Sequence, residues 1–209
     1  MRVDRPGPGE ELNHGAETVA RLAATVIVLR GGAETLEVLL VQRHPAQRFM
    51  GGAWVFPGGA LDAGDGEGQR GLRAAAIREV AEEAGVALPD PEALVPYSRW
   101  ITPAEVKVRF DTWFFLARSP AHAEPRVDGQ ECVSWRWSIP DAALDAYRHG
   151  ELVLVFPTIK HLEQLGGFAT ADAVMEHARG REVRPVQPRV LGSGETARVV
   201  LPGEPGYED

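Results

Sequence analysis

The sequence predicts an α/β or α+β sandwich, and three observations lead to this class. Apolar, β-branched runs separated by turn residues open the chain, one clear helix follows, and further strands and helices are interspersed after it. A length of 209 residues corresponds to about one domain, which can bury a core without covalent staples. The single cysteine, Cys132, excludes an intramolecular disulfide and a cysteine-rich metal site.

The individual elements follow from local patterns. The apolar, β-branched run at 21–29 predicts a first strand, and 37–42 predicts a second strand that pairs with it across a Gly-containing turn. The glycine-rich segment 43–71 is expected to be mostly loop, and the Ala-rich segment 72–84 predicts the clearest helix. Further strands are expected at 97–101, 112–117 and 131–137, and short helices at 141–149, 158–165 and 170–179.

The two ends of the chain differ from its centre. Residues 1–17 are low in apolar content and predict a flexible N-terminal tail before a domain spanning 18–181. The segment 182–209 carries four prolines and a valine-rich stretch at 197–201. It is expected to be an extension that packs on the domain or on a partner subunit.

Charge and hydropathy exclude several classes of function. The formal net charge of −8 and the absence of a basic stretch disfavour a nucleic-acid partner. No apolar run approaches the roughly 18 residues that a membrane span requires, so no membrane partner is expected. The polar N-terminal segment lacks the apolar core of a secretory signal, which favours a cytoplasmic location.

The predicted helix 72–84 carries three carboxylates on one side. An advance of about 100° per residue places Glu79, Glu82 and Glu83 within an arc of about 100°, opposite a face of small apolar residues. The apolar face predicts packing on a sheet. The acidic face is either a solvated charged surface or a set of oxygen ligands for a hard divalent cation such as Mg²⁺. Periodicity alone does not decide between these two interpretations.

The residues around this helix resemble the Nudix hydrolase signature, G-x5-E-x7-R-E-U-x-E-E-x-G-U with U aliphatic. The run REVAEEAGV, which begins at Arg78, matches the second half at every specified position, and Phe-Pro-Gly-Gly ending at Gly59 precedes it. Asp65 stands where the first glutamate is expected. Twelve residues instead of seven separate it from Arg78, so an insertion around 66–71 lengthens the loop. Asp65 and Glu67 both remain candidates for the missing acid.

The resemblance implies an α/β/α sandwich with a mixed β-sheet and a loop-helix-loop motif. It also implies hydrolysis of a nucleoside diphosphate derivative with the help of Mg²⁺ or Mn²⁺. The metal ligands would be Glu79, Glu82, Glu83 and the main-chain carbonyl of Gly59. A further glutamate from a later loop can serve as a base, and Glu131 is the candidate. The alternative interpretation is that Glu131 is a solvated acid at the end of a strand. The implied catalytic residues are Arg78, Glu82, Glu83 and Glu131.

A second resemblance narrows the substrate. From Leu39 to Gly59 the chain is similar to the coenzyme A diphosphatase motif, L-L-T-x-R-S-x3-R-x3-G-x3-F-P-G-G. Arg43 and Arg48 match in register, and with Gly58 they are expected to contact substrate phosphates, although both arginines can also be ordinary surface residues. Val41 and His44 depart from the motif by standing where Thr and Ser are expected.

A third resemblance covers much of the remaining chain. The segments 100–103, 109–115, 156–158 and 201–207 look like the peroxisomal acyl-CoA diphosphatase branch of the family and its bacterial relatives. Arg109 is therefore a further candidate for substrate binding. The expected activity is hydrolysis of coenzyme A or acyl-CoA to 3′,5′-ADP and a 4′-phosphopantetheine product. The alternatives are hydrolysis of ADP-ribose, NADH or another nucleoside diphosphate derivative, and a Nudix-like binding module without turnover. For the oligomeric state, the resemblance allows a homodimer.

Overall fold

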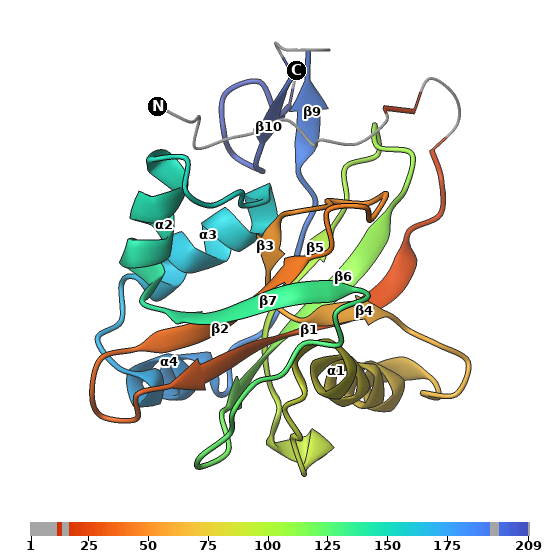
Figure 1. Ribbon diagram of the computed structural model, residues 1–209. Coiled ribbons are helices and arrows are strands. Elements are labelled where there is room, and N and C mark those ends of the chain that lie inside the picture. Colours follow the sequence, from red (N-terminus) through yellow and green to blue (C-terminus); the bar gives the residue numbers. More distant parts are fainter. Residues whose placement is uncertain (1–11, 14–16, 193–196, 209) are drawn as a thin grey trace.

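A mixed β-sheet with helices on both faces forms the centre of the molecule in a computed structural model, which describes residues 12–13, 17–192 and 197–208 (Figure 1). This arrangement confirms the predicted α/β/α sandwich. The main sheet has the strand order β3-β2-β1-β6-β5-β8, with β4 paired to β1 and β7 paired to β2. The pairs β1–β6 and β5–β8 are parallel and the other pairs of this sheet are antiparallel.

The strands lie close to the positions that the sequence predicts, with a few short additions. A separate two-stranded ribbon is formed by β9 and β10. The short strands β3, β4, β8 and β9 are not predicted by sequence. The bounds are β1 Arg21–Arg30, β2 Glu37–Arg43, β3 Trp54–Val55, β4 Gly58–Ala60, β5 Val95–Ile101, β6 Phe110–Arg118, β7 Cys132–Ser138, β8 Pro185–Val186, β9 Arg189–Leu191 and β10 Arg198–Val200.

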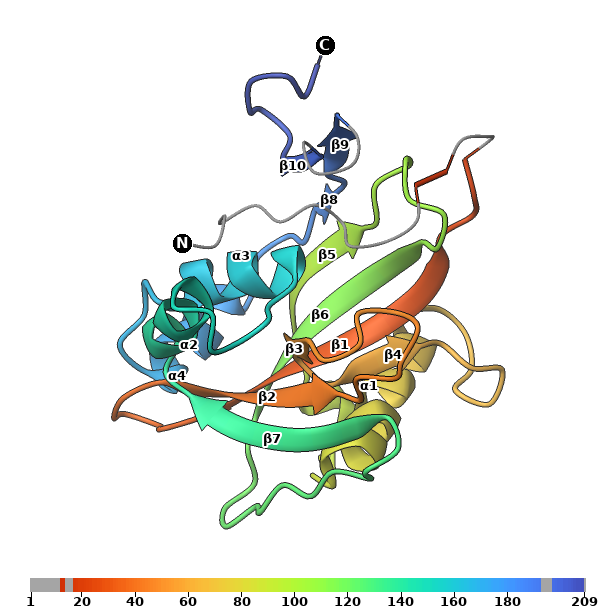
Figure 2. The same cartoon turned by 45° about the horizontal axis from the view of Figure 1, so that its top comes forward.

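In the described part of the chain, four α-helices divide between the two faces of the sheet. Helix α1 covers one face next to β1 and β4, and the other three helices lie on the opposite face (Figure 2). A short 3-10 helix, Pro91–Ala93, precedes β5. The bounds are α1 Gly68–Ala84, α2 Pro140–Arg148, α3 Phe156–Leu165 and α4 Ala171–Ala178.

Alternation along the strands produces two separate cores. In β1, Val26 and Val28 belong to the core beneath α1, whereas Ile27 and Leu29 belong to the core beneath α2, α3 and α4. Successive side chains of a strand point to opposite faces, so a continuous apolar run supplies both layers. The long apolar run of β1 is therefore the sequence of a strand buried on both faces.

Helix α1 packs closely on the sheet because its inner face is small. Ala75, Ala76, Val80 and Ala84 are completely buried there. The helix begins at Gly68, four residues before the predicted start, so part of the expected loop insertion is helical. It ends at Ala84 and is capped by Gly85, whose φ of +63° is a left-handed conformation that glycine adopts without strain.

Segments near both ends of the described chain contact the domain. Strand β8 pairs with β5, and the valine-rich stretch forms β10, which pairs with β9. The N–H of Asn13 donates to the Glu105 carbonyl at 2.6 Å. Most of the predicted flexible tail, residues 1–11 and 14–16, lies outside the described residues. Among the helices that the structure describes, none is both long enough and apolar enough to cross a bilayer.

Candidate active site

The turn between β3 and β4 brings backbone directly against helix α1. The Gly58 N–H donates to Glu83 Oε2 at 2.8 Å. A Cβ at Gly58 would lie 2.5 Å from the Ala24 carbonyl oxygen, so only glycine fits between this strand and β1. The Pro-Gly-Gly turn therefore holds one oxygen of the Glu83 carboxylate through a backbone donor.

The neighbouring glycine makes room for the second buried carboxylate. A Cβ at Gly59 would overlap the carboxylate of Glu79, which is 8% exposed. Arg78 Nη1 donates to Oε1 of the same carboxylate at 2.8 Å. The backbone at Gly59 and the carboxylate of Glu79 thus share one small volume.

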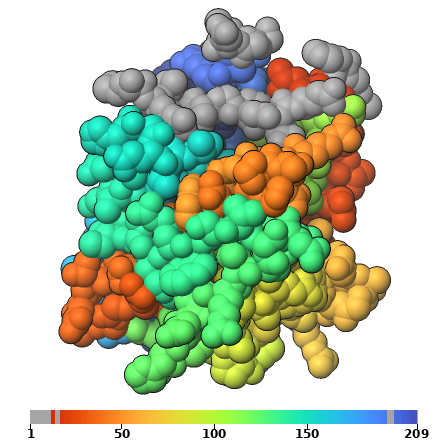
Figure 3. All heavy atoms as spheres, viewed as in Figure 1, coloured from red at the N-terminus to blue at the C-terminus, as the bar shows by residue number. Residues whose placement is uncertain are grey.

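These carboxylates line a cleft of about 430 Å³. Glu131, immediately before β7, reaches the same cleft from another part of the chain, as do Arg43 at the end of β2 and Arg21 at the start of β1. The loop 44–53, orange in Figure 3, crosses the surface beside β7, green, and contributes Phe49 and Met50 to the lining. The cleft is therefore built from segments that are far apart in sequence.

Burial raises the pKa of the Glu79 and Glu83 carboxylates in the cleft above the ordinary value for glutamate. Removal from water, together with the charges of Glu79 and Glu131, raises the pKa of Glu83 to about 7, against the lowering effects of the Gly58 N–H and Arg43. Burial likewise raises the pKa of Glu79, although Arg78 opposes this shift. Buried like charges that face a cleft are a common property of functional sites.

Arg78 organises the loop before the helix. Its guanidinium donates through Nε to Asp65 Oδ1 at 3.0 Å and through Nη2 to Asp65 Oδ2 at 2.9 Å, which is a bidentate pair. The hydrogen bond from Arg78 holds the pKa of Asp65 below its usual value. Glu67 instead occupies the N-cap position of α1. Of the two acids that the sequence leaves open, Asp65 is the one that pairs with Arg78.

Arg78 does not line the cleft, and neither do three further predicted site residues. The Glu82 side chain is 60% exposed and pairs with Arg78 at 3.0 Å, and Arg48 is exposed. Arg109 is buried, donates to the carbonyls of Thr102 and Thr18, and pairs with Glu17, so it ties the N-terminal segment to the β5–β6 connection. Roles in metal or substrate binding for these three residues stay predictions.

Arg43 connects the acidic cleft with the loop 44–53. Its Nε donates to the Phe49 carbonyl at 3.1 Å, Nη2 donates to Gln47 at 3.4 Å, and Nη1 lies 3.9 Å from Glu83 Oε1. The guanidinium therefore offers positive charge to the cleft while it holds the loop. Arg21 also lines the cleft and is not selected by the sequence analysis, because an arginine at a strand start carries no distinguishing local signal.

The donor set fits an open site for a divalent cation. Within the described part of the chain, no three Asp, Glu, His or Cys side chains are grouped as a ready metal cage. Mg²⁺ does not require one, because it usually keeps several waters and takes one or two carboxylates together with substrate phosphates. Glu79 and Glu83 are buried beside a backbone turn that leaves no space for a side chain, and a cation there would relieve their mutual repulsion.

Comparisons with known proteins agree with this arrangement. The NUDIX domain matches residues 19–156. The chain is 26% identical to "Acyl-coenzyme A diphosphatase NUDT19" of Homo sapiens, over 84% of this chain and 73% of that protein. It is 26% identical to "Putative nudix hydrolase 7" of Caenorhabditis elegans, over 82% of this chain and 68% of that protein. Among solved structures, a NUDIX hydrolase from Alicyclobacillus acidocaldarius aligns with a TM-score of 0.69 and 31% identity, covering 76% of this chain and 96% of that one.

Proposed function

The chain belongs to the Nudix hydrolase family, and on this premise we propose that it hydrolyses the diphosphate bond of coenzyme A or of an acyl-CoA. The products would be 3′,5′-ADP and 4′-phosphopantetheine or its acylated form. The observation that carries the proposal is the position of Arg43, a residue of the coenzyme A motif, in the cleft that holds Glu79 and Glu83.

The charges of the cleft suit a diphosphate. Arg43 offers a planar, permanently charged guanidinium, which is well matched to phosphate oxygens. Nudix enzymes generally use divalent cations, and we propose Mg²⁺ or Mn²⁺ held by Glu79 and Glu83, with the Gly59 carbonyl and Glu82 as further ligands. When bound, such a cation neutralises the charge of the diphosphate and activates a water molecule for attack.

The chain's own groups then have distinct tasks. The Gly58 N–H fixes one oxygen of Glu83, so that its other oxygen, Oε1, lies 3.9 Å from Arg43. Glu131 stands across the cleft and is our candidate for the group that takes the proton from the attacking water. Arg78 holds Glu79 and the loop at Asp65 in a single network, which makes it a positioning residue.

The two departures from the coenzyme A motif are compatible with the proposal. The Val41 side chain is completely buried in the core beneath α1, so a hydroxyl at this position would not face the cleft. The Nδ1 of His44 accepts from the Ala46 N–H at 3.1 Å, and a serine hydroxyl commonly forms this type of bond to the backbone two residues on.

The similarity to a curated acyl-CoA diphosphatase supports the same substrate class. The relative from Homo sapiens carries this activity in its name and aligns with most of the chain.

A substrate panel tests the proposal. Purified protein with Mg²⁺ or Mn²⁺ would be given coenzyme A, acetyl-CoA, a long acyl-CoA, dephospho-CoA, ADP-ribose, NADH and 8-oxo-dGTP, with products identified by mass. We expect coenzyme A species to be cut at the diphosphate, and dephospho-CoA to be a much poorer substrate. Preference for ADP-ribose or NADH would overturn the substrate assignment and leave the family chemistry intact.

A further inference from the structure

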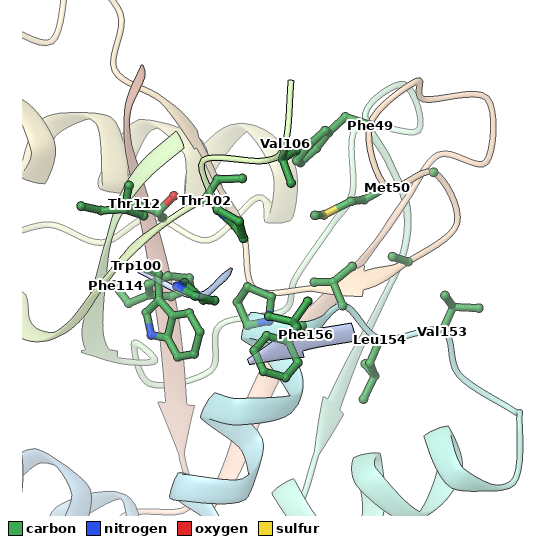
Figure 4. A pocket seen from close by; sticks show the side chains of 18 residues that line it. Phe49, Met50, Trp100, Thr102, Val106, Thr112, Phe114, Val153, Leu154 and Phe156 are labelled. Atoms are coloured by element: carbon green, nitrogen blue, oxygen red, sulfur yellow. The ribbon is translucent and has the colours of Figure 1, made fainter. Parts of the chain in front are cut away.

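A second cavity, of about 290 Å³, adjoins the acidic cleft. Phe49, Met50, Thr112 and Pro157 are among the residues that line both spaces. Figure 4 shows the cavity with the rings of Trp100, Phe114 and Phe156 around one part of it, and Phe49 and Met50 across from them. A ligand whose diphosphate lies in the cleft can therefore extend into this cavity.

The cavity differs from the cleft in its chemistry. None of the described residues that line it is charged, whereas the cleft contains three carboxylates and two arginines. Its hydroxyl groups belong to Thr102 and Thr112, and Thr102 already accepts from the Phe110 N–H at 3.0 Å. A dry, aromatic surface of this type favours an uncharged, mostly apolar group.

The C-terminal segment and the loop 44–53 complete the walls of the cavity. Pro188 and Val199, both buried, come from the C-terminal segment, beyond the residues that match the NUDIX domain. The pairing of β8 with β5 fixes this segment to the sheet, and the Val190 N–H donates to Glu105 at 3.3 Å. On the other side, Arg43 holds the loop that carries Phe49.

We propose that this cavity binds the uncharged pantetheine arm of the substrate and the first carbons of a thioester-linked acyl chain, so that the C-terminal segment helps to determine specificity. This inference rests on the proposed function. The adenosine end of coenzyme A carries a 3′-phosphate, which would need a cation that the lining of the cavity lacks. The arm that leaves the diphosphate on the other side is uncharged and carries methyl groups and methylenes, which match the lining.

Chain-length dependence of the reaction tests the assignment. We would measure kcat/KM for coenzyme A and for acetyl-, butyryl-, hexanoyl- and octanoyl-CoA in the wild type and in Val153→Trp. Val153 lines the cavity but is 45% exposed, so a larger side chain can enter the rim without disturbing the core. Ile139→Trp is the matched control, because Ile139 is 43% exposed and lines neither space.

We expect kcat/KM of the wild type to rise by about threefold to fourfold per added methylene until the cavity is full. Val153→Trp should remove this gain and lower the octanoyl-CoA to coenzyme A ratio by about tenfold or more. Ile139→Trp should leave the ratio unchanged. Cleavage of coenzyme A with no chain-length gain, or a ratio that Val153→Trp does not change, would overturn the inference while the proposed function stands. If the wild type cleaves no coenzyme A species, both fail.

Competition experiments separate the two halves of the substrate. S-octanoyl-pantetheine, which has no phosphate, should inhibit the wild type and should inhibit Val153→Trp about tenfold less well. Inhibition by 3′,5′-ADP should be the same in both proteins. The reverse pattern, with weakened inhibition by 3′,5′-ADP alone, would assign the cavity to the nucleoside and overturn the inference.

Discussion

On the α1 face of the sheet, Glu79 and Glu83 are buried carboxylates at the edge of a cleft. On the opposite face, His161 is a buried imidazole among aromatic rings. The carboxylates repel each other, and burial raises the pKa of both. The imidazole has a partner for each ring nitrogen, with Nδ1 2.7 Å from the Pro157 carbonyl and Nε2 2.6 Å from Ser98 Oγ.

The two faces therefore differ in role: the carboxylates form a candidate site, and His161 makes a structural contact. Because a carbonyl only accepts, Nδ1 of His161 carries a proton. Near neutral pH a ring with a lowered pKa holds no second proton, so Nε2 then accepts from the Ser98 hydroxyl. Burial lowers the pKa of this ring to about 4. A polar group whose partners are all internal ties α3 to β5, whereas two carboxylates buried next to each other at the edge of a cleft are candidates for binding a cation. Each prediction below tests one side of this contrast.

The largest expected effect is on catalysis. Glu83→Gln and Glu79→Gln should each lower kcat by about two to four orders of magnitude, because a neutral amide cannot balance a cation or accept a proton. The metal-free variants should unfold at the same or a higher temperature than the wild type, since a buried charge has been removed. Initial rates and thermal unfolding measure both effects. Glu176→Gln, at an 81% exposed side chain, is the control, and near-normal rates in both site variants would exclude the metal assignment.

The next effect concerns stability and pH. The pKa of His161 is lowered in the folded state, so the unfolded chain binds a proton that the folded chain does not between pH 6.5 and about 4. Stability from this group is complete above pH 6.5 and is lost as the pH falls, by about 2 kcal/mol at pH 5. Denaturant unfolding should show this loss in the wild type and a smaller loss in His161→Gln. An equal loss in both proteins, or an NMR titration of the His161 ring near pH 6.5, would contradict the structural assignment.

The variant Glu82→Gln tests whether Glu82, the exposed member of the acidic triplet, binds the metal together with Glu79 and Glu83. Removing its charge should raise the Mg²⁺ concentration for half-maximal rate by about tenfold to a hundredfold in Glu82→Gln, with recovery at saturating Mg²⁺. Titration of the rate with Mg²⁺ measures this shift. An unchanged Mg²⁺ dependence would remove Glu82 from the metal ligands and leave it as the partner of Arg78.

The smallest expected effect is on the loop before the helix. Asp65→Asn should lower kcat/KM by about tenfold, because the bidentate partner of Arg78 loses its charge and the support of Glu79 weakens. Glu67→Gln is the matched control and should leave kcat/KM unchanged. Equal losses in the two variants, measured under identical Mg²⁺, would mean that the loop as a whole, and not the Asp65 pair, supports the site.

Local patterns were sufficient for the long elements. The apolar run of β1, the small-residue face of α1 and the left-handed Gly85 act within a few neighbouring residues, so the sequence predicts these elements within a few positions. The start of α1 at Gly68 was missed because two glycines in its first turn weaken the helical pattern. The strands β3 and β4 have two and three residues, which is too short for any periodicity.

The sequence by itself determined the resemblance to the Nudix signature, because the Pro-Gly-Gly turn and the acidic helix are close together along the chain. It also placed three glutamates on one side of that helix. Only the tertiary structure decided that Glu79 and Glu83 are buried in the cleft while Glu82 is turned outward, since the rotation of α1 is set by its packing on the sheet. The meeting of Glu131 and Arg43 with these carboxylates, the burial of Arg109, and the wall that Pro188 and Val199 add to the apolar cavity join distant segments. Such contacts depend on how strands pair across the whole sheet, and no local pattern records that pairing.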